Sequence, residues 1–250
     1  MKKNDREHRI ISLLEMRGEM SVEELSAILG ISASTLRKQL AEMRNKGLII
    51  RTYGGVMSVN PVLDESFDSK LHKNVAEKRR IATKGRSLIK EGSTVALASG
   101  TSVYALCTLM NDMGRGTVYT NSMQVAEYLA RCASLEIHIC GGIIRSHTGT
   151  IIGNDVADYF KGLKIDCAFL GCDAIDSDGT VYSDNLAAAT SERAVITSAK
   201  KIYVLCDSSK LGKKSVAKIT HLSDCTALIT GKEGSNIADA LQYITEVIYV

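Results

Sequence analysis

The stretch from residue 31 to residue 56, ISASTLRKQLAEMRNKGLIIRTYGGV, constrains the fold of this chain most strongly. A short helix is predicted to end at Gly30, and a tight turn through Ile31 and Ser32 opens a second helix. A basic, hairpin-like segment that carries Arg51 follows this second helix. The order is typical of a helix-turn-helix with a wing, a unit that places one helix in the DNA major groove.

Three short helices, each with one apolar stripe, are expected in this part of the chain. The first runs from about residue 5 to residue 17. Ser21 with Glu24 forms the pattern of a capping box, which starts the second helix. Ser32 is placed to cap the third helix. The inward stripe of the third helix is expected to be Leu36, Leu40 and Met43.

The placement of charge supports a DNA-binding role for these helices. Residues 1–57 hold ten Lys and Arg against seven Asp and Glu, so they carry the whole net charge of +3. Neutralisation of phosphates by such side chains supplies most non-specific DNA affinity. A plain three-helix bundle without DNA contacts is the alternative, but the turn, the outward basic residues and the wing together favour DNA binding. The expected DNA-binding residues are Ser32, Ser34, Thr35, Arg37, Lys38, Arg51 and Tyr53.

The pattern changes after the only proline of the chain, Pro61. Because the residue before a proline is biased away from helix, we expect a domain boundary here, with a DNA-binding domain over 1–57, a linker over 58–74 and a second domain over 75–250. From Val75 onward, short apolar runs alternate with helical patterns, which predicts a mainly parallel α/β sheet. Strands are expected over 94–98, 117–120, 135–140, 167–170, 202–205 and 227–229, and helices over 76–89, 102–110 and 123–132.

Small polar loops follow three of the predicted strands. Ligands of parallel α/β sheets bind at the carboxyl ends of the strands, and glycine, hydroxyl groups and helix starts all suit an anion. Each loop by itself is equally typical of turn and helix-capping chemistry, but three at one sheet edge favour a phosphate or carboxylate ligand. No Walker or GxGxxG pattern is present, which argues against a nucleoside triphosphate or a dinucleotide. The loop residues are Ser99, Gly100, Thr101, Ser102, Thr120, Asn121, Ser122, Gly141, Gly142 and Arg145.

Two further residues follow predicted strands and complete the expected effector site. Asp173 is placed to accept hydrogen bonds from sugar hydroxyls, although a solvated turn explains it equally well. Lys210 is placed to supply a counter-charge for a phosphate, the alternative being an ordinary surface lysine.

The chain shows no sign of a metal site, a cofactor or a membrane segment. Its seven cysteines and five histidines have no metal-ligand spacing, so reduced thiols and no metal or cofactor are expected. The first twenty residues are too charged for a signal peptide, and no apolar run is long enough to span a bilayer. We therefore expect a cytoplasmic protein.

Taken in order, these segments resemble the DeoR family of bacterial transcriptional regulators over essentially the whole chain. The resemblance rests on SVEELSAILGISASTLRKQLAEMRNKGLIIRTYGGV, ASGTSVYAL, VYTNSMQVAEYLA, CGGIIR, DCAFLGCDAID and VLCDSSKLG. It implies a winged helix-turn-helix domain followed by a sensor domain with a fold like ribose-5-phosphate isomerase. It also implies a repressor of sugar or polyol catabolism that releases its operator when a phosphorylated sugar binds.

The sequence departs from the usual family pattern at three places. Residues 35–40 read TLRKQL where the family commonly has TIRRDL, so that Lys38 and Gln39 are expected to alter operator preference. Ala174 stands where glycine is usual. Alanines at 187–189 stand where an acidic residue is usual, with Glu192 shifted along the chain, which bears on the effector contacts.

Two other functions are weighed against the repressor. An isomerase or transferase on the same scaffold needs a positioned base and acid, for which Asp173, Asp178, Glu192 and Lys210 are the candidates, but no spacing pairs them. A sensor domain that binds no small molecule and serves only oligomerisation is the other. The sequence favours a regulator that is not an enzyme. Because one reading head makes few contacts, a homodimer or homotetramer on operator DNA is expected.

Overall fold

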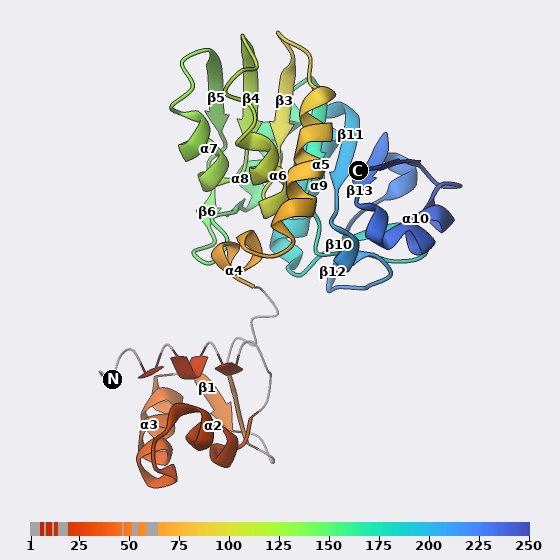
Figure 1. Cartoon of the computed structure of the whole chain (residues 1–250). Helices are drawn as coiled ribbons and strands as arrows, with labels where there is room; N and C mark the ends of the chain where they lie inside the picture. Colours follow the sequence, from red (N-terminus) through yellow and green to blue (C-terminus); the bar gives the residue numbers. More distant parts are fainter. Residues whose placement is uncertain are drawn as a thin grey trace. The chain divides into compact units, whose positions relative to one another are not determined.

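The computed structural model describes residues 6–7, 9–11, 13–14, 20–46, 48–51, 55–58 and 65–250. The chain divides into two compact units, Met1–Glu65 and Ser66–Val250 (Figure 1). Within the described residues, no helix combines the length and the apolar composition needed to cross a bilayer.

The N-terminal unit has the predicted helix-turn-helix order. Residues 6–7, 9–11 and 13–14 are helical and belong to the first predicted helix. They are followed by α2 (Val22–Leu29) and α3 (Ala33–Asn45). Gly30 ends α2 in the left-handed conformation, with φ 64°, which lets the chain turn sharply into α3. The core of this unit consists of buried apolar side chains from all three helices and the wing: Ile10, Leu13, Leu14, Met20, Leu25, Leu36, Leu40, Met43, Ile49 and Val56.

The wing is an antiparallel pair of short strands, β1 (Ile49–Arg51) and β2 (Val56–Ser58). Met20 forms an isolated bridge with Val56, which ties the wing back to the segment before α2. Gly55 is required at this crossing, because a Cβ there would lie 2.2 Å from the carbonyl oxygen of Met20. The predicted hairpin is therefore confirmed by the described residues on either side of its turn.

The second unit is built on the predicted parallel sheet, with strand order β14-β13-β11-β8-β3-β4-β5. All of its pairings are parallel, so the carboxyl ends of its strands lie along one edge (Figure 1). The strands are β3 (Thr94–Leu97), β4 (Gly116–Thr120), β5 (Leu135–Ile139), β8 (Ile165–Leu170), β11 (Ala199–Leu205), β13 (Ala227–Thr230) and β14 (Glu246–Tyr249). The fold class predicted from the sequence is confirmed, although β14 falls outside the predicted strands.

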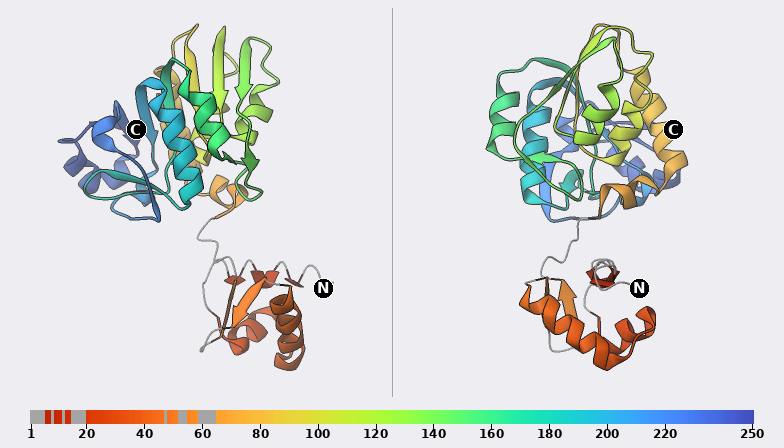
Figure 2. Two further views of the ribbon diagram at one scale, coloured as in Figure 1. Left: turned by 180° about the vertical axis from the view of Figure 1, so that it is seen from behind. Right: turned by 90° about the vertical axis from the view of Figure 1, so that its left-hand side faces the viewer.

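Helices cover both faces of this sheet, as the views from two sides show (Figure 2). One apolar core joins the sheet to α5, α6 and α7, and a second joins its other face to α8, α9 and α10. The helix bounds are α5 (Val75–Ser87), α6 (Thr101–Cys107), α7 (Met123–Leu129), α8 (Asn154–Lys161), α9 (Leu186–Thr197) and α10 (Ser235–Leu241). Burial on both faces explains the continuous apolar runs of β3, β8 and β13, whereas the edge strand β5 reads LEIHI and alternates.

Two small antiparallel arrangements lie beside the main sheet. A three-stranded sheet has the order β12-β10-β9, and a two-stranded one pairs β6 with β7. Their bounds are β6 (Ile143–Ile144), β7 (Ile151–Ile152), β9 (Ala174–Ile175), β10 (Thr180–Ser183) and β12 (Ala217–His221). The β9–β10 hairpin matters for the site, because it brings the residues after β10 back to those after β8.

The second half of the predicted linker belongs to the sensor unit. Residues 66–74 lie inside the second compact unit, and Phe67–Leu71 forms the short helix α4. Ser66 caps this helix by accepting a hydrogen bond from the Ser69 backbone N–H. The ring of Phe67 packs edge-to-face on Tyr104 of α6, with centroids 5.4 Å apart. The polar sequence of α4 concealed this anchoring contact.

Candidate functional site

The recognition helix α3 is positioned by local capping on both sides of the turn. Ser21 and Glu24 form the predicted capping box, in which each side chain accepts from the other residue's backbone N–H. Ser32 caps α3, because its hydroxyl accepts a hydrogen bond from the Thr35 backbone N–H at 3.3 Å. The Ser32 and Thr35 hydroxyls also lie 2.9 Å apart. These hydroxyls therefore build the start of the helix.

The outward face of α3 carries most of the residues expected to contact DNA. Ser34, Thr35, Arg37 and Lys38 are exposed, while the inward stripe is buried as predicted. Gln39, the second unusual residue of this helix, is buried, with only 5% of the residue exposed. Of the two unusual residues of TLRKQL, Lys38 alone stands on the exposed face.

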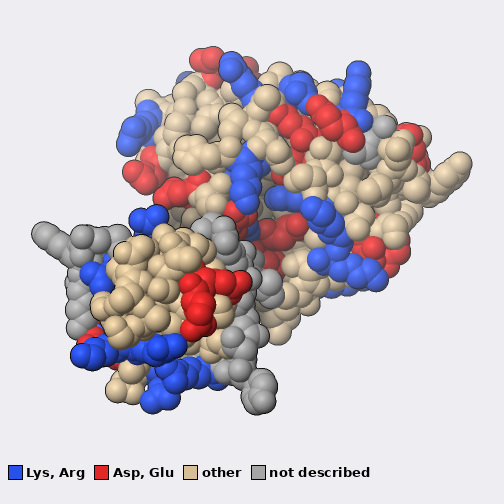
Figure 3. All heavy atoms as spheres, turned by 60° about the horizontal axis from the view of Figure 1, so that its bottom comes forward, with Lys and Arg blue, Asp and Glu red and all other residues tan. Residues whose placement is uncertain are grey.

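Arg37 forms a weak, solvent-exposed ion pair. Its guanidinium pairs with Glu23 at 3.2 Å, and the two side chains are 56% and 72% exposed. Exposed pairs of this kind contribute about 0–1 kcal/mol, so a phosphate or a base can replace Glu23 at small cost. Arg51 is exposed on β1, while Tyr53 lies outside the described residues. Lys and Arg side chains gather along one margin of the N-terminal unit (Figure 3).

The polar loops at the carboxyl edge of the sheet divide into two groups. In the first group, the hydroxyls form hydrogen bonds with the backbone. Thr120 donates to the Leu97 carbonyl at 2.6 Å, and Ser122 caps α7. Asn121 is fully buried, and its side-chain oxygen has no hydrogen-bond partner. Gly142 has φ 142°, and a Cβ there would lie 2.6 Å from the Ile152 carbonyl oxygen. This group shapes the edge of the sheet.

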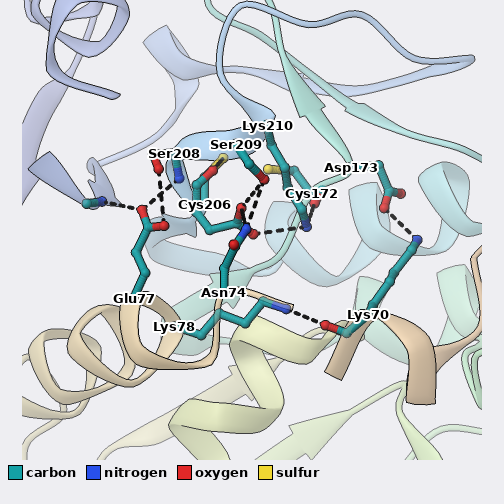
Figure 4. Close-up of polar contacts among 12 residues, drawn as sticks. Lys70, Asn74, Glu77, Lys78, Cys172, Asp173, Cys206, Ser208, Ser209 and Lys210 are labelled. Atoms are coloured by element: carbon teal, nitrogen blue, oxygen red, sulfur yellow. Dashed lines mark hydrogen bonds and ion pairs between the residues drawn. The ribbon is translucent and has the colours of Figure 1, made fainter. Parts of the chain in front are cut away.

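The second group forms a charged cluster around Asp173. The Lys70 Nζ of α4 donates to Asp173 at 2.8 Å and to Asp184 at 2.9 Å (Figure 4 shows the Lys70–Asp173 contact). The Asp184 backbone N–H also donates to Asp173, at 3.0 Å. The three side chains are between 8% and 23% exposed, so the pairing is largely shielded from water. We refer to Lys70, Asp173 and Asp184 as the acidic cluster.

Burial and charge act in opposite directions within the acidic cluster. Burial disfavours the charged form of Lys70, but Asp173 and Asp184 outweigh it and raise its pKa, so Lys70 stays protonated. Burial likewise opposes ionisation of Asp173, yet Lys70 and Lys210 lower its pKa. The pKa of Asp184 is raised by burial and by the charge of Asp173, against the stabilising effect of Lys70 and Arg145. The cluster thus holds one ammonium group for two carboxyl groups.

Glu192 of α9 is a buried carboxyl group next to this cluster. Its side chain accepts a hydrogen bond from the Ser99 hydroxyl at 3.2 Å, while its second oxygen is buried without a hydrogen-bond partner. Burial, then the charge of Asp173, raise the pKa of Glu192 to about 8. Glu192 is therefore mainly protonated at neutral pH. A ligand hydroxyl is one group that can satisfy its unpaired oxygen.

Lys210 closes the cluster on the side of β11. Its Nζ donates to the Cys172 carbonyl at 2.6 Å and lies 3.7 Å from Asp207 (Figure 4).

Asn74, with φ 51°, donates to Asp207 at 2.7 Å and to Ser209 at 3.0 Å. Glu77 accepts from the backbone and hydroxyl of Ser208. The contacts of Asn74 and Glu77 join the start of α5 to the loop after β11.

The structure brings together only part of the residues predicted for the effector site. Asp173 belongs to the acidic cluster, Arg145 and Lys210 act on its carboxyl groups, and Ser99 bonds to the neighbouring Glu192. The remaining loop residues lie at or after the ends of β3, β4 and β5. Asp178 lies in an exposed turn, where it accepts from the Thr180 backbone. The prediction missed two cluster residues, Lys70 and Asp184. Their signal in the sequence is weak, because Lys70 lies 103 and 114 residues from its partners.

Comparison with known proteins agrees with this architecture. A model of the DeoR-like helix-turn-helix domain matches residues 6–62, and a model of the DeoR C-terminal sensor domain matches residues 73–232. A putative aga operon transcriptional repressor of Escherichia coli O157:H7 is 33% identical over 86% of this chain and 81% of its own length. The glycerol-3-phosphate regulon repressor of Escherichia coli K12 is 29% identical over 92% of this chain and 91% of its own length.

Among solved structures, ribose 5-phosphate isomerase A from Methanocaldococcus jannaschii is similar over 56% of this chain and 55% of that chain, with 16% identity and a TM-score of 0.43. The two family models together account for both compact units of the structure. The chain belongs to the DeoR family of transcriptional regulators.

Proposed function

We propose that this protein is a repressor of a sugar or polyol operon that leaves its operator when a phosphorylated sugar binds at the acidic cluster. The observation that carries the DNA-binding part is the exposed face of α3, where Arg37 and Lys38 project from a helix capped at its start. Loosely held basic side chains on such a helix are suited to exchange their partners for phosphates and base edges. The two relatives described above are named as repressors, which supports the sign of the regulation.

The chemistry of the sensor edge supports a polyhydroxylated anion as the effector. Asp173 and Asp184 offer carboxylate oxygens to hydroxyl groups, and Lys210 and Arg145 supply positive charge for a phosphate. The unpartnered oxygens of Glu192 and Asn121 lie buried at the same edge of the sheet. A buried polar atom without a partner is costly, so a ligand that reaches these atoms gains from satisfying them.

We further propose that the sensor binds its ligand without catalysing a reaction on it. We also propose that the protein acts in the cytoplasm as a homodimer or homotetramer. The relatives are named as regulators, and a single helix-turn-helix makes too few contacts for a tight operator complex. Incubation of the purified protein with ribose 5-phosphate tests the first part, since isomerisation at enzyme-like rates would contradict it. Light scattering of the protein in solution tests the second.

The main experiment combines footprinting with thermal denaturation. DNA from upstream of the protein's own gene is footprinted with and without a panel of phosphorylated sugars and polyols. A compound that removes the footprint should also raise the melting temperature of the free protein, because a ligand of the native state alone must stabilise it. The proposal fails if the DNA is not protected, or if no phosphorylated compound changes either measurement.

A further inference from the structure

The helix α4 is the first element of the sensor unit, directly after the boundary at Glu65 and Ser66. It has five residues, and helices shorter than about 12 residues are marginally stable in water without outside contacts. Its persistence therefore depends on what holds it to the rest of the unit. α4 is the point where the chain enters the sensor unit, so its attachment fixes where that unit begins.

Two kinds of contact hold α4 in place. The first is not available to a polar ligand: the Phe67 ring lies against Tyr104, and the Phe67 backbone N–H donates to the His147 carbonyl at 2.9 Å. The second is ionic, the bridge from the Lys70 Nζ to Asp173 and Asp184. The Lys70 carbonyl in turn accepts a hydrogen bond from Lys78 of α5. The ionic contact thus joins α4 and α5 to the carboxyl edge of the sheet.

The carboxylates that hold Lys70 are the groups assigned above to ligand hydroxyls. Asp173 lies directly after β8, and Asp184 follows β10. Hydroxyl groups of a sugar would bond to the same oxygens that Lys70 occupies. A phosphate group would offer the Lys70 ammonium a stronger anionic partner than a shared carboxylate. Ligand and bridge therefore compete at both ends of the contact.

We propose that Lys70 is an effector-binding residue whose exchange from Asp173 and Asp184 to the ligand releases α4 and so weakens operator binding. The inference rests on the proposed function, since it assigns the route by which a phosphorylated sugar acts at this site. By linkage, whatever loosens the bridge in the absence of ligand must mimic the effector, and whatever preserves it must oppose the effector. In this arrangement the ligand-free, bridged form is the form that binds DNA.

The test compares three variants with the wild-type protein. Lys70→Met removes the ammonium group, Lys70→Arg keeps a cation at the same place, and Lys200→Met is the matched control. Lys200 also pairs with an aspartate, Asp166, at 3.0 Å, but at the start of its strand and with both side chains largely exposed. Amide hydrogen exchange over residues 67–71 reports the attachment of α4. Fluorescence anisotropy with the footprinted DNA reports operator affinity.

In Lys70→Met we expect exchange over 67–71 to accelerate and operator affinity to fall, each by roughly tenfold or more, because a largely buried ion pair is broken. In Lys70→Arg, exchange over 67–71 and operator affinity should both stay close to the wild-type values. Lys200→Met should change neither the exchange nor the affinity. A phosphorylated sugar that stabilises the wild type should accelerate exchange over the same residues. Unchanged exchange in Lys70→Met overturns the proposal, as does faster exchange with unchanged operator affinity.

Slow exchange in the central strands of Lys70→Met serves as the check that the variant is folded. If Lys70→Met loses this protection, the comparison is made between Asp184→Asn and the wild type, since that variant weakens the bridge and keeps its shape. Failure of the proposed function is seen separately, as a wild-type protein that protects no DNA and is stabilised by no phosphorylated compound.

Discussion

Arg37 on α3 and Lys70 on α4 each form ion pairs with carboxylates, but the two pairs lie in different surroundings. The Arg37 and Glu23 side chains are more than half exposed, whereas Lys70 and its two partners are at most 23% exposed. Water screens the first pair, so breaking it costs about 0–1 kcal/mol. Breaking the second leaves shielded charges without partners, at a cost of about 3–5 kcal/mol.

This difference matches the task of each region. A surface that must accept any suitable DNA phosphate works best when its own ion pairs are weak. A sensor must remain in one state until its own ligand binds. This requires buried ion pairs that break only when a complementary ligand supplies new contacts in their place. On the proposed function, the same residue types thus allow rapid exchange of partners on α3 and set a threshold for ligand binding at the acidic cluster.

The largest effect is expected from Lys210→Ala. Its ammonium lies 3.7 Å from Asp207, whose side chain is only 1% exposed, so removal leaves a buried carboxylate with less compensation. We expect a loss of about 3 kcal/mol in the free energy of unfolding, with the response to the effector abolished and operator binding retained in the folded protein. Chemical denaturation and anisotropy with operator DNA measure the two quantities. A folded variant that cannot bind DNA would show that Lys210 is not part of the sensor.

Glu192→Gln sharpens the comparison through pH. A carboxyl group whose pKa rises from 4.5 in the unfolded chain to about 8 in the folded one stabilises the fold fully below about pH 4.5. That contribution is lost as the pH rises through about 8, at up to about 1.4 kcal/mol per pH unit. Glutamine does not titrate, so the variant should gain stability relative to the wild type between about pH 5 and pH 8. If the melting temperatures of the two proteins change with pH by the same amount over this range, the raised pKa of Glu192 is contradicted.

The sequence predicted those features that depend on neighbouring residues. The capping box of Ser21 and Glu24 and the cap at Ser32 each involve residues three apart, so their geometry follows from local pattern. The central strands of the main sheet were recognisable because burial on both faces requires continuous apolar runs, whereas the largely unburied edge strand β14 was missed. The proximity of Asp173 and Lys210 was predictable because residues that follow buried parallel strands lie at one edge of the sheet.

The acidic cluster could not be completed from the sequence, because its members meet only through the tertiary fold. Lys70 lies in a polar segment that resembles a linker, and nothing local marks α4 as packed against the sheet. Asp184 reaches Asp173 only through the β9–β10 hairpin. Glu192 was named as a possible catalytic group and as a displaced acidic residue, but its burial was not foreseen, since a sequence does not show that a carboxyl group will be buried. The burial of Gln39 was not foreseen for the same reason, since nothing in the sequence marks a polar side chain of a helix as buried.

Arg37→Ala tests the exposed side of the comparison. We expect operator affinity to fall by about tenfold, the loss of a single contact to a base or a group of phosphates, while the melting temperature stays within error. Arg131→Ala is the matched control, because Arg131 also forms an exposed pair, with Glu127, but on the sensor unit. Anisotropy at two salt concentrations separates phosphate from base contacts, since only the loss of a phosphate contact reduces the salt dependence of binding. An unfolded Arg37→Ala protein would mean that the side chain is structural.

The smallest effect is expected from Ser32→Ala, which removes the cap of α3 and leaves its basic face unchanged. Loss of an N-cap costs about 1 kcal/mol, which should appear as a lower melting temperature of the N-terminal unit. If the Ser32 hydroxyl serves only the helix, operator affinity measured well below the melting temperature should match that of the wild type. Loss of affinity in excess of the loss of stability would instead make Ser32 a direct DNA contact.

Ser66→Ala provides the corresponding change at α4, where the cap accepts from the Ser69 backbone N–H at 3.2 Å. On the role proposed for α4, the same loss of about 1 kcal/mol should loosen this helix and weaken operator binding.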